Sequence, residues 1–411
     1  MNRRDFLRTS FAGGSMVSLG LTVPTFLTRT AWAAPTADRA GSKDTILVVV
    51  QLTGGNDGLN TVVPFRDENY AKLRPTLRIP TNRLHKVNDE LGLHPSMQGL
   101  ADLLQDQALC IVQGVGYPNP NQSHFRSMDI WHAASLDREL TEGWIGKALR
   151  QTPQTLAFHL ADNNESSPLA LAGAPRSVPS VTSLQDFQLR TNALSSAERA
   201  ERTKIIEKAA QTSAGSKPSL LDFVKRTAVN TYESSKRLQE VAGNYQPKVP
   251  YPNTPLANRL RVAAQLIEAG MGARIFYVSI GGFDTHANQL NTHANLLAQL
   301  SGAMTAFYKD LAARGHKDRI LMMTFSEFGR RPYENGSKGT DHGAAAPMLL
   351  VGGKVKAGVV GEHPSLVKNV IRGNMRHNID FRQVYATILD NWLGIPSKDV
   401  LGQPFNHVDI F

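Results

Sequence analysis

Residues 46–58 read ILVVVQLTGGNDG, a run of large apolar side chains that ends in glycines and two polar residues. A continuous, mostly β-branched stretch of this kind is typical of a strand that is buried on both faces, as in a parallel sheet covered by helices. The glycines that follow favour a tight turn, in which Asn56 and Asp57 are also common residue types. The stretch predicts an α/β fold with a polar loop directly after its first strand.

The same pattern recurs along the rest of the chain. After the first strand at residues 44–55, strands are predicted at residues 108–116, 273–282, 318–329 and 346–353. Amphipathic helical patterns lie between them and at the end of the chain, at residues 95–107, 256–272, 293–315 and 380–395. Strands that alternate with helices favour a three-layer α/β/α sandwich around a mostly parallel, doubly wound sheet.

Two segments fall outside this pattern. Residues 162–252 are rich in Ser, Thr, Gln, Lys and Glu with helical patches, which indicates a helical insertion in a single domain spanning residues 44–411. Residues 1–33 carry Arg3 and Arg4 before a weak apolar stretch that ends in Ala-Trp-Ala, the pattern of a twin-arginine signal peptide. We therefore expect export by the Tat machinery to the periplasm or the medium, with no transmembrane anchor after cleavage.

The charge of the chain limits its partners. The formal net charge is +10, and the four arginines and one acid of residues 1–33 contribute +3, so that cleavage leaves +7. The remaining basic residues are scattered without a Lys/Arg-rich run, which argues against nucleic-acid binding and favours an anionic small-molecule or polymer substrate. The single cysteine excludes an internal disulfide and a Cys-rich zinc site.

Polar side chains follow the first four predicted strands, and Asp341 and His342 lie in the loop beyond the fourth, at the edge where ligands bind in open α/β sheets. Carboxylates and imidazoles in these segments are suitable ligands for one or two divalent ions such as Zn²⁺, Mn²⁺, Mg²⁺ or Ca²⁺. The predicted metal ligands are Asp57, Asp284, His286, Glu327, Asp341 and His342.

A candidate catalytic set accompanies these ligands. Ser123 precedes a helical pattern, so it is either an N-cap or a nucleophile activated beside a metal. His124 follows it directly. Arg330 either clamps a phosphate or sulfate group or is a solvated surface charge.

The chain resembles a family of bacterial proteins called domain of unknown function 1501 (DUF1501), over about residues 46–393. Besides the twin-arginine signal, the motifs that carry the resemblance are LTGGNDGLNTVVP (52–64), SHFRSMDIWH (123–132), GGFDTHANQ (281–289), TFSEFGRRPYENGSKGTDHG (324–343) and PMLLVGG (347–353). That family in turn looks like the alkaline phosphatase and sulfatase superfamily. The resemblance implies a doubly wound sandwich with a one- or two-metal site at the strand ends.

The resemblance also implies roles for individual residues. Asp57 matches the first metal-binding Asp of the superfamily, and Ser123 stands where its nucleophile precedes a helix. Asp284 and His286 match a later ligand pair, and His342 matches the last metal-binding His.

The chain departs from the superfamily pattern at two places. Ser326 and Glu327 follow the strand after which the superfamily has Asp-His. The sulfatase signature Cys-x-Pro-x-Arg is absent, and Ser123 is followed by His124 rather than by Pro or Ala and then Arg, so formylglycine chemistry is not expected. The prediction is an exported metal-dependent hydrolase of phosphate or sulfate esters. Two alternatives stay open: a non-catalytic metal-binding protein with an envelope partner, and a scaffold on the same fold without metal.

Overall fold

The computed structural model describes residues 45–162, 165–184, 240–241, 243–368 and 370–411. The predicted signal peptide and most of the predicted insertion lie outside these residues. The chain divides into two units, of which the first comprises residues 1–42, 181–246 and 265–272. The second unit comprises residues 43–180, 247–264 and 273–411, and it contains every predicted site residue.

A mixed sheet forms the centre of the second unit. Its first strand, β1 (Ile46–Leu52), pairs in parallel with β8 (Ala273–Ile280) on one side and with β9 (Ile320–Phe325) on the other. Beyond these lie β5 (Leu109–Gly116), β6 (Leu156–Leu160), β10 (Ala346–Gly352) and β11 (Gly358–Val360), in the order β11-β5-β10-β9-β1-β8-β6, with β12 (Ile379–Asp380) also paired to β5. The predicted strands are confirmed, and β6, β11 and β12 are additions to them.

The direction of β10 differs from that of its neighbours. β10 is antiparallel to both β9 and β5, whereas β1, β8 and β9 run parallel to one another. The amino-terminal end of β10 therefore lies at the same edge of the sheet as the carboxyl ends of β1, β8 and β9. This reversal explains how the residues just before β10 reach the edge at which ligands are expected.

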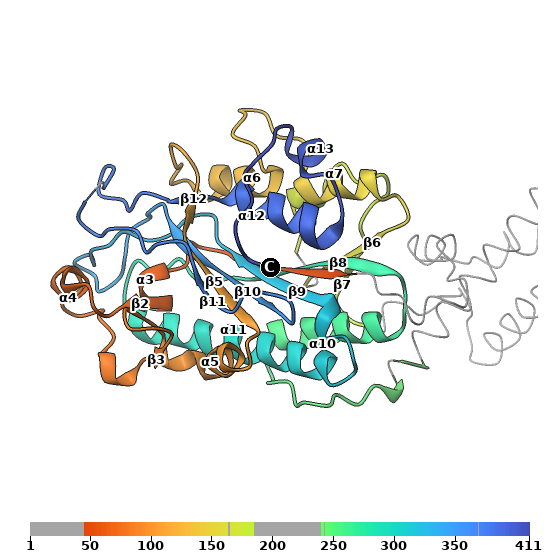
Figure 1. Ribbon diagram of the computed structural model, residues 1–411, viewed down its shortest axis with the longest axis horizontal. Helices are drawn as coiled ribbons and strands as arrows, with labels where there is room; N and C mark the ends of the chain where they lie inside the picture. The colour runs from red at the N-terminus through yellow and green to blue at the C-terminus, as the bar shows by residue number, and fades with distance from the viewer. Residues whose placement is uncertain (1–44, 163–164, 185–239, 242, 369) are drawn as a thin grey trace, which may run out of the picture. The chain divides into compact units, whose positions relative to one another are not determined.

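Helices cover both faces of the sheet (Figure 1). One face carries α6 (His124–Ala133), α7 (Trp144–Gln151), α12 (Phe381–Thr387) and α13 (Ser397–Leu401). The other carries α5 (Gln98–Gln105), α11 (Gln289–Ala312) and α10 (Pro255–Glu268), of which residues 255–264 belong to this unit. The predicted three-layer α/β/α sandwich with a mostly parallel sheet is confirmed.

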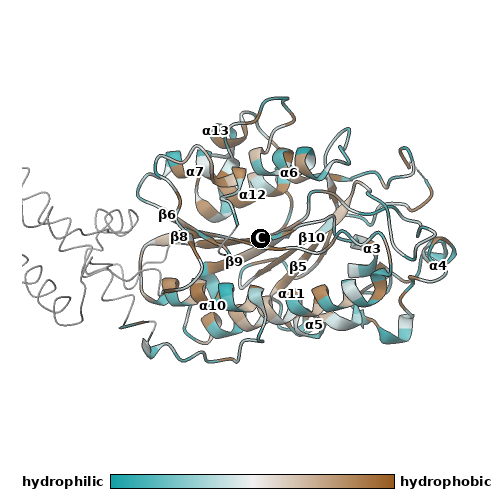
Figure 2. Ribbon diagram, turned by 180° about the vertical axis from the view of Figure 1, so that it is seen from behind, coloured by the Kyte–Doolittle hydropathy of each residue, from teal (hydrophilic) through white to brown (hydrophobic). Residues whose placement is uncertain are grey.

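The core explains the continuous apolar runs of the sequence. All of β1 is buried, as is all of β9, because each has a helical layer above and below it. Trp131, Trp144 and Tyr385 pack from the helices of one layer into a single hydrophobic cluster with the sheet. The apolar colouring of the strands in Figure 2 follows this burial.

Smaller elements complete the described chain. A second sheet has the order β2-β4-β3, from β2 (Val62–Pro64), β3 (His85–Lys86) and β4 (Leu91–Leu93). The short helical segments are α3 (Gly58–Thr61), α4 (Glu68–Leu73), the 3₁₀ turns Thr81–Arg83, Pro95–Met97, Leu169–Leu171 and Lys317–Arg319, and the π-helix Ile388–Leu393 that continues α12. The two-residue strand β7 (Ser180–Val181) crosses the boundary between the units. Within the described residues, the helices lack the combined length and hydropathy that crossing a membrane requires.

Candidate functional site

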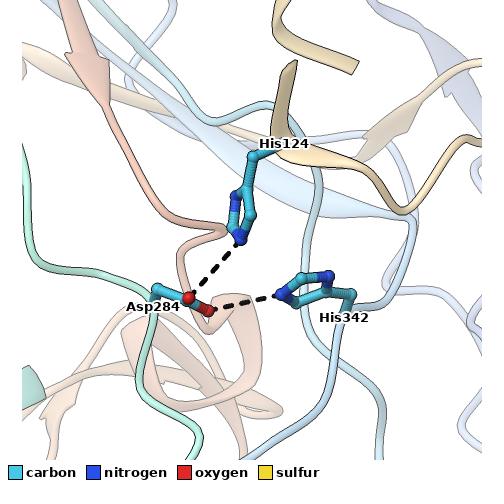
Figure 3. A group of neighbouring side chains, drawn as sticks. All are labelled: His124, Asp284 and His342. Atoms are coloured by element: carbon cyan, nitrogen blue, oxygen red, sulfur yellow. Dashed lines mark hydrogen bonds and ion pairs between the residues drawn. The ribbon is translucent and has the colours of Figure 1, made fainter. Parts of the chain in front are cut away.

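Three side chains from distant parts of the sequence meet at the edge formed by the ends of β8 and β9 and the start of β10. His124 begins α6, Asp284 follows β8, and His342 precedes β10. One ligand atom of each lies within 4.8 Å of those of the other two. Nε2 of His124 is 3.5 Å from Oδ2 of Asp284, and Nε2 of His342 is 3.3 Å from Oδ1 (Figure 3).

Glu327 fixes the orientation of His124. Its buried carboxylate lies 2.7 Å from Nδ1 of His124 and accepts a second hydrogen bond from the backbone N–H of Gly54. Because an ionised carboxylate only accepts hydrogen bonds, Nδ1 of His124 carries a proton, and in the neutral imidazole the lone pair is on Nε2. Nε2 is buried and has no hydrogen-bond partner among the described residues. In the neutral ring this lone pair faces Asp284, an arrangement that a bound cation would satisfy.

The backbone orients His342 in the same sense. Nδ1 of His342 is 2.8 Å from the carbonyl oxygen of Gln122, which only accepts, so the proton is on Nδ1. The lone pair of Nε2 is thereby directed toward Asp284. Burial lowers the pKa of His342, which favours the neutral imidazole that binds metals.

His286 extends the group. Its Nε2 is 2.9 Å from Nε2 of His342 and 3.1 Å from Oδ1 of Asp284. Its Nδ1 is 3.4 Å from Oδ1 of Asp341, which also accepts a hydrogen bond from Asn335. The structure thus places His286 beside two of the three residues of the group, Asp284 and His342, and places Asp341 behind it rather than at the centre.

Several of these separations are compatible with a shared ion. Two ligand atoms that each lie about 2.0–2.1 Å from a tetrahedral zinc ion are about 3.3 Å apart. The separations from Asp284 to the three histidines, and from His286 to His342, run from 2.9 to 3.5 Å, although His124 faces the other carboxylate oxygen. A donor set dominated by imidazole favours zinc or a similar transition metal over Mg²⁺ and Ca²⁺, which prefer oxygen ligands.

Arg330 holds Asp284 rather than a substrate. The guanidinium is fully buried and donates to the carbonyl oxygens of Gly55 and Thr340 at 2.7 and 2.6 Å, and to Oδ1 of Asp284 at 2.6 Å. Burial alone would raise the pKa of Asp284, but the hydrogen bond and charge of Arg330 outweigh it and lower that pKa. With its donors engaged by the protein, Arg330 is not positioned to clamp a phosphate or sulfate group, contrary to our expectation.

Asp57 lies outside this group. Both of its oxygens pair with the guanidinium of Arg74, at 2.6 and 2.9 Å, and the two side chains are fully buried. The carboxylate also accepts hydrogen bonds from the N–H of Leu59 and the amide of Gln289. Burial would raise the pKa of Asp57, but the charge and hydrogen bonds of Arg74 outweigh it, so the pKa is lowered. The family resemblance implies that Asp57 binds a metal, but in this structure its carboxylate forms a buried ion pair with Arg74 instead.

The two predicted serines differ in their surroundings. Ser123 occupies the N-cap position of α6, but its exposed hydroxyl makes no capping hydrogen bond, so capping does not account for it. Ser326 is buried, where it donates to the carbonyl oxygen of Leu52 and accepts from the N–H of Asn56. Ser123 therefore keeps a hydroxyl available beside His124, whereas Ser326 is part of the packing between loops.

The sequence did not reveal two residues that hold the candidate site residues in place, and it predicted the wrong role for a third. Gln122 contributes through its backbone carbonyl, which no side-chain pattern reveals. Arg74 comes from a loop that carries no motif. Glu327 was predicted as a ligand, and its oxygens instead face Nδ1 of His124 and the hydroxyl of Ser326.

Comparison with known proteins gives a family and distant structural similarities. The family described as "Protein of unknown function (DUF1501)" matches residues 44–406, and no curated protein gives a significant sequence match. Similar structures include the zinc complex of the C-terminal periplasmic domain of EcEptC from Escherichia coli, with 10% identity, 77% and 74% coverage of this chain and that one, and a TM-score of 0.35. A protein of the alkaline phosphatase superfamily from Vibrio parahaemolyticus has 9% identity, 92% and 76% coverage, and a TM-score of 0.36. The PsFucS1 sulfatase from Pseudoalteromonas sp. has 12% identity, 95% and 75% coverage, and a TM-score of 0.37. At these values the similarities assign no activity.

Proposed function

The chain belongs to the DUF1501 family, as its motifs indicated, and from the geometry of its site we propose that it is an exported, metal-dependent hydrolase of phosphate or sulfate esters. The proposed ligands are His124, Asp284 and His342, with His286 as the fourth. Asp57 is not included, because Arg74 already satisfies its carboxylate.

One observation carries the proposal. Nε2 of each of two imidazoles faces the same carboxylate, and each ring has an acceptor behind its Nδ1. Metal-binding histidines usually donate their other N–H to a carboxylate or a backbone carbonyl, and this site has one of each. In the neutral rings, a cation between them would satisfy both lone pairs and the carboxylate.

The chain's own residues prepare this site for an ester. Arg330 keeps Asp284 ionised and in place, and Glu327 holds the imidazole of His124. Ser123 stands at the first turn of α6, where backbone N–H groups stabilise an anion and where its free hydroxyl is the proposed nucleophile. A bound divalent ion would supply a Lewis acid that polarises the ester oxygens and favours the ionised nucleophile. Asp284 is 47% exposed, so a substrate can reach the group from solvent.

Export is proposed from the sequence of residues 1–33. The arginine pair, the weak apolar stretch and the Ala-Trp-Ala site together are typical of Tat substrates. The double variant Arg3→Lys, Arg4→Lys should accumulate in the cytoplasm, whereas the wild type should appear in the periplasmic fraction. Equal distribution of the two proteins would contradict export by this route.

The hydrogen bonds of Arg330 and Arg74 to other protein groups favour a second candidate function, that of a metal-binding envelope protein without catalytic activity. The donors of Arg330 are taken by the protein, and those of Arg74 pair with Asp57 and nearby oxygens. Neither is free to hold the transferred group of an ester. A protein that binds metal, hydrolyses none of the test esters and co-purifies with an envelope partner would support this candidate.

Elemental analysis together with ester assays tests the proposal. Protein purified without chelator should contain about one transition-metal ion per chain, and it should hydrolyse at least one of p-nitrophenyl phosphate, bis(p-nitrophenyl) phosphate and p-nitrophenyl sulfate when Zn²⁺, Mn²⁺ or Ca²⁺ is added. His342→Ala and Asp284→Asn should lose both the ion and the turnover. His316→Ala is the matched control, because His316 lies before β9, at the opposite end of that strand from Glu327. Folded protein without bound metal would refute the metal site, and metal without turnover would refute the hydrolase.

A further inference from the structure

A cavity of about 570 Å³ lies beside the candidate metal centre. Three segments line it: the loop that leads into α6, the residue after Arg330, and a turn near residue 372. The lining residues are Asn119, Pro120, Asn121, Gln122, Arg331, Ile371, Arg372 and Asn374.

Gln122 joins the cavity to the metal centre. Its backbone carbonyl accepts from Nδ1 of His342, and its side-chain amide donates to the carbonyl oxygen of His342 at 3.0 Å. The same amide donates to Oδ1 of Asn374, 3.2 Å away, and Asn374 also lines the cavity. A molecule in the cavity is therefore separated from His342, a proposed metal ligand, by one residue, Gln122.

The chemistry of the lining indicates the charge of the occupant. Two arginines, Arg331 and Arg372, and four residues with side-chain amides line the cavity, and none of the lining residues carries a carboxylate. Nη1 of Arg331 donates to the hydroxyl of Tyr333 at 2.6 Å, while its Nε is buried without a partner among the described residues. Guanidinium groups bind oxyanions, and side-chain amides both donate to and accept from hydroxyl groups.

The turn that carries Arg372 is held in place. Ile371 and Asn374 pair through two backbone hydrogen bonds of 3.0 Å, with Arg372 and Gly373 at φ values of 51° and 80° between them. A Cβ on Gly373 would come within 2.9 Å of the hydroxyl of Tyr333, so the turn packs closely on the residue that Arg331 contacts. A non-glycine residue with positive φ is strained, and the surrounding packing must maintain it.

We propose that this cavity binds the part of the ester that is not transferred, and that this part carries an oxyanion and several hydroxyl groups, as an acidic sugar does. The role of the cavity as a substrate subsite rests on the proposed hydrolase function. The binding of an acidic sugar in the cavity does not depend on that function. The oxyanion is a carboxylate or a sulfate, because either one presents a pair of oxygens to the two N–H groups of a guanidinium.

Binding measurements with three small sugars test this proposal. Glucuronate carries a carboxylate, glucose 6-sulfate carries a sulfate, and glucose carries neither. Titrations followed by NMR, on protein with Zn²⁺ and on protein treated with EDTA, should show at least one of the two anions binding at least tenfold more tightly than glucose. Which anion binds more tightly identifies the oxyanion.

Variants of the lining connect the binding to the cavity. Arg331→Gln and Arg372→Gln should each weaken binding of the preferred anion by tenfold or more. Arg376→Gln should not, because Arg376 is also exposed and lies close in sequence but does not line the cavity. Because Arg372 is exposed, its variant is expected to fold, and a melting curve verifies this.

The outcomes separate the two proposals. Equal affinity for glucose and the two anions, or an affinity that does not change in Arg372→Gln, would overturn the acidic-sugar subsite even if esters are hydrolysed. Anion binding that persists after EDTA and is lost in Arg372→Gln, in a protein that hydrolyses no ester, would support the cavity and refute the hydrolase.

Discussion

Replacing Glu327 by Gln removes the charge behind His124 and leaves the shape of the site almost unchanged. The remaining carbonyl oxygen can still accept from Nδ1 of His124 and from the N–H of Gly54, at the present separations of 2.7 and 2.9 Å. The new amide N–H can donate to the hydroxyl oxygen of Ser326, 3.0 Å away. That oxygen can accept, because the hydroxyl donates its own proton to the carbonyl oxygen of Leu52. The variant therefore isolates the effect of the carboxylate charge on the imidazole.

The expected loss is in metal affinity rather than in folding. A carboxylate behind a metal-binding histidine raises its basicity, and changing such a partner typically costs tenfold to hundredfold in affinity. We expect the dissociation constant for Zn²⁺ to rise by that factor in Glu327→Gln, which corresponds to about 1.4–2.7 kcal/mol. Since no buried hydrogen-bonding group loses its partner, the melting temperature of the metal-free protein should change little.

Competition with a chromophoric chelator measures this dissociation constant. Glu334→Gln is the matched control, because the carboxylate of Glu334 accepts from the N–H groups of Thr76 and Leu77 and takes no part in the metal centre. We expect its affinity for Zn²⁺ to stay within twofold of the wild type. An affinity of Glu327→Gln within threefold of the wild type, with an unchanged melting temperature, would refute the inferred role of Glu327.

Three further predictions concern stability, catalysis and pH. Arg74→Met leaves Asp57 buried without its partner and should lower the free energy of unfolding by about 3–5 kcal/mol in urea titrations; a loss below 1 kcal/mol would contradict a structural ion pair. Ser123→Ala should lower kcat at least about a hundredfold with metal content unchanged, and unaltered turnover would assign the attack to water instead. Burial lowers the pKa of His132 to about 3. Between about pH 6.5 and 3 its imidazole is therefore protonated in the unfolded chain and neutral in the folded protein. Stability should fall as pH falls through that window, by about 1.4 kcal/mol per pH unit from this residue, and His132→Gln should have a shallower slope between pH 7 and 5.

The main strands were predictable because the helical layers on both faces leave a continuous apolar signal. β1 and β9 are buried along their whole length, and their boundaries lie within the predicted segments. β6 was missed because its five residues, LAFHL, are short and include a histidine. His159 is buried there all the same, with Nδ1 3.0 Å from the hydroxyl of Ser180.

The sequence predicted where several of the candidate site residues lie, and their metal-binding roles stay a prediction. Asp284, His286 and His342 meet as their positions near strand ends suggested. Arg330 and Glu327 lie at the same edge but serve other side chains, because buried charges must be paired or hydrogen-bonded where they lie. Which partner each would find depends on loops far away in the sequence.

The sequence by itself determined the layered α/β architecture, the family, and the edge at which polar groups gather, because burial on both faces and strand-end polarity are local patterns. Only the tertiary structure decided that β10 runs against its neighbours and so brings His342 to the carboxyl ends of β8 and β9. It alone showed that Arg74 neutralises Asp57. It also decided that Nε2 of His124 and of His342 faces Asp284, since the acceptor behind Nδ1 of each ring is brought there only by folding.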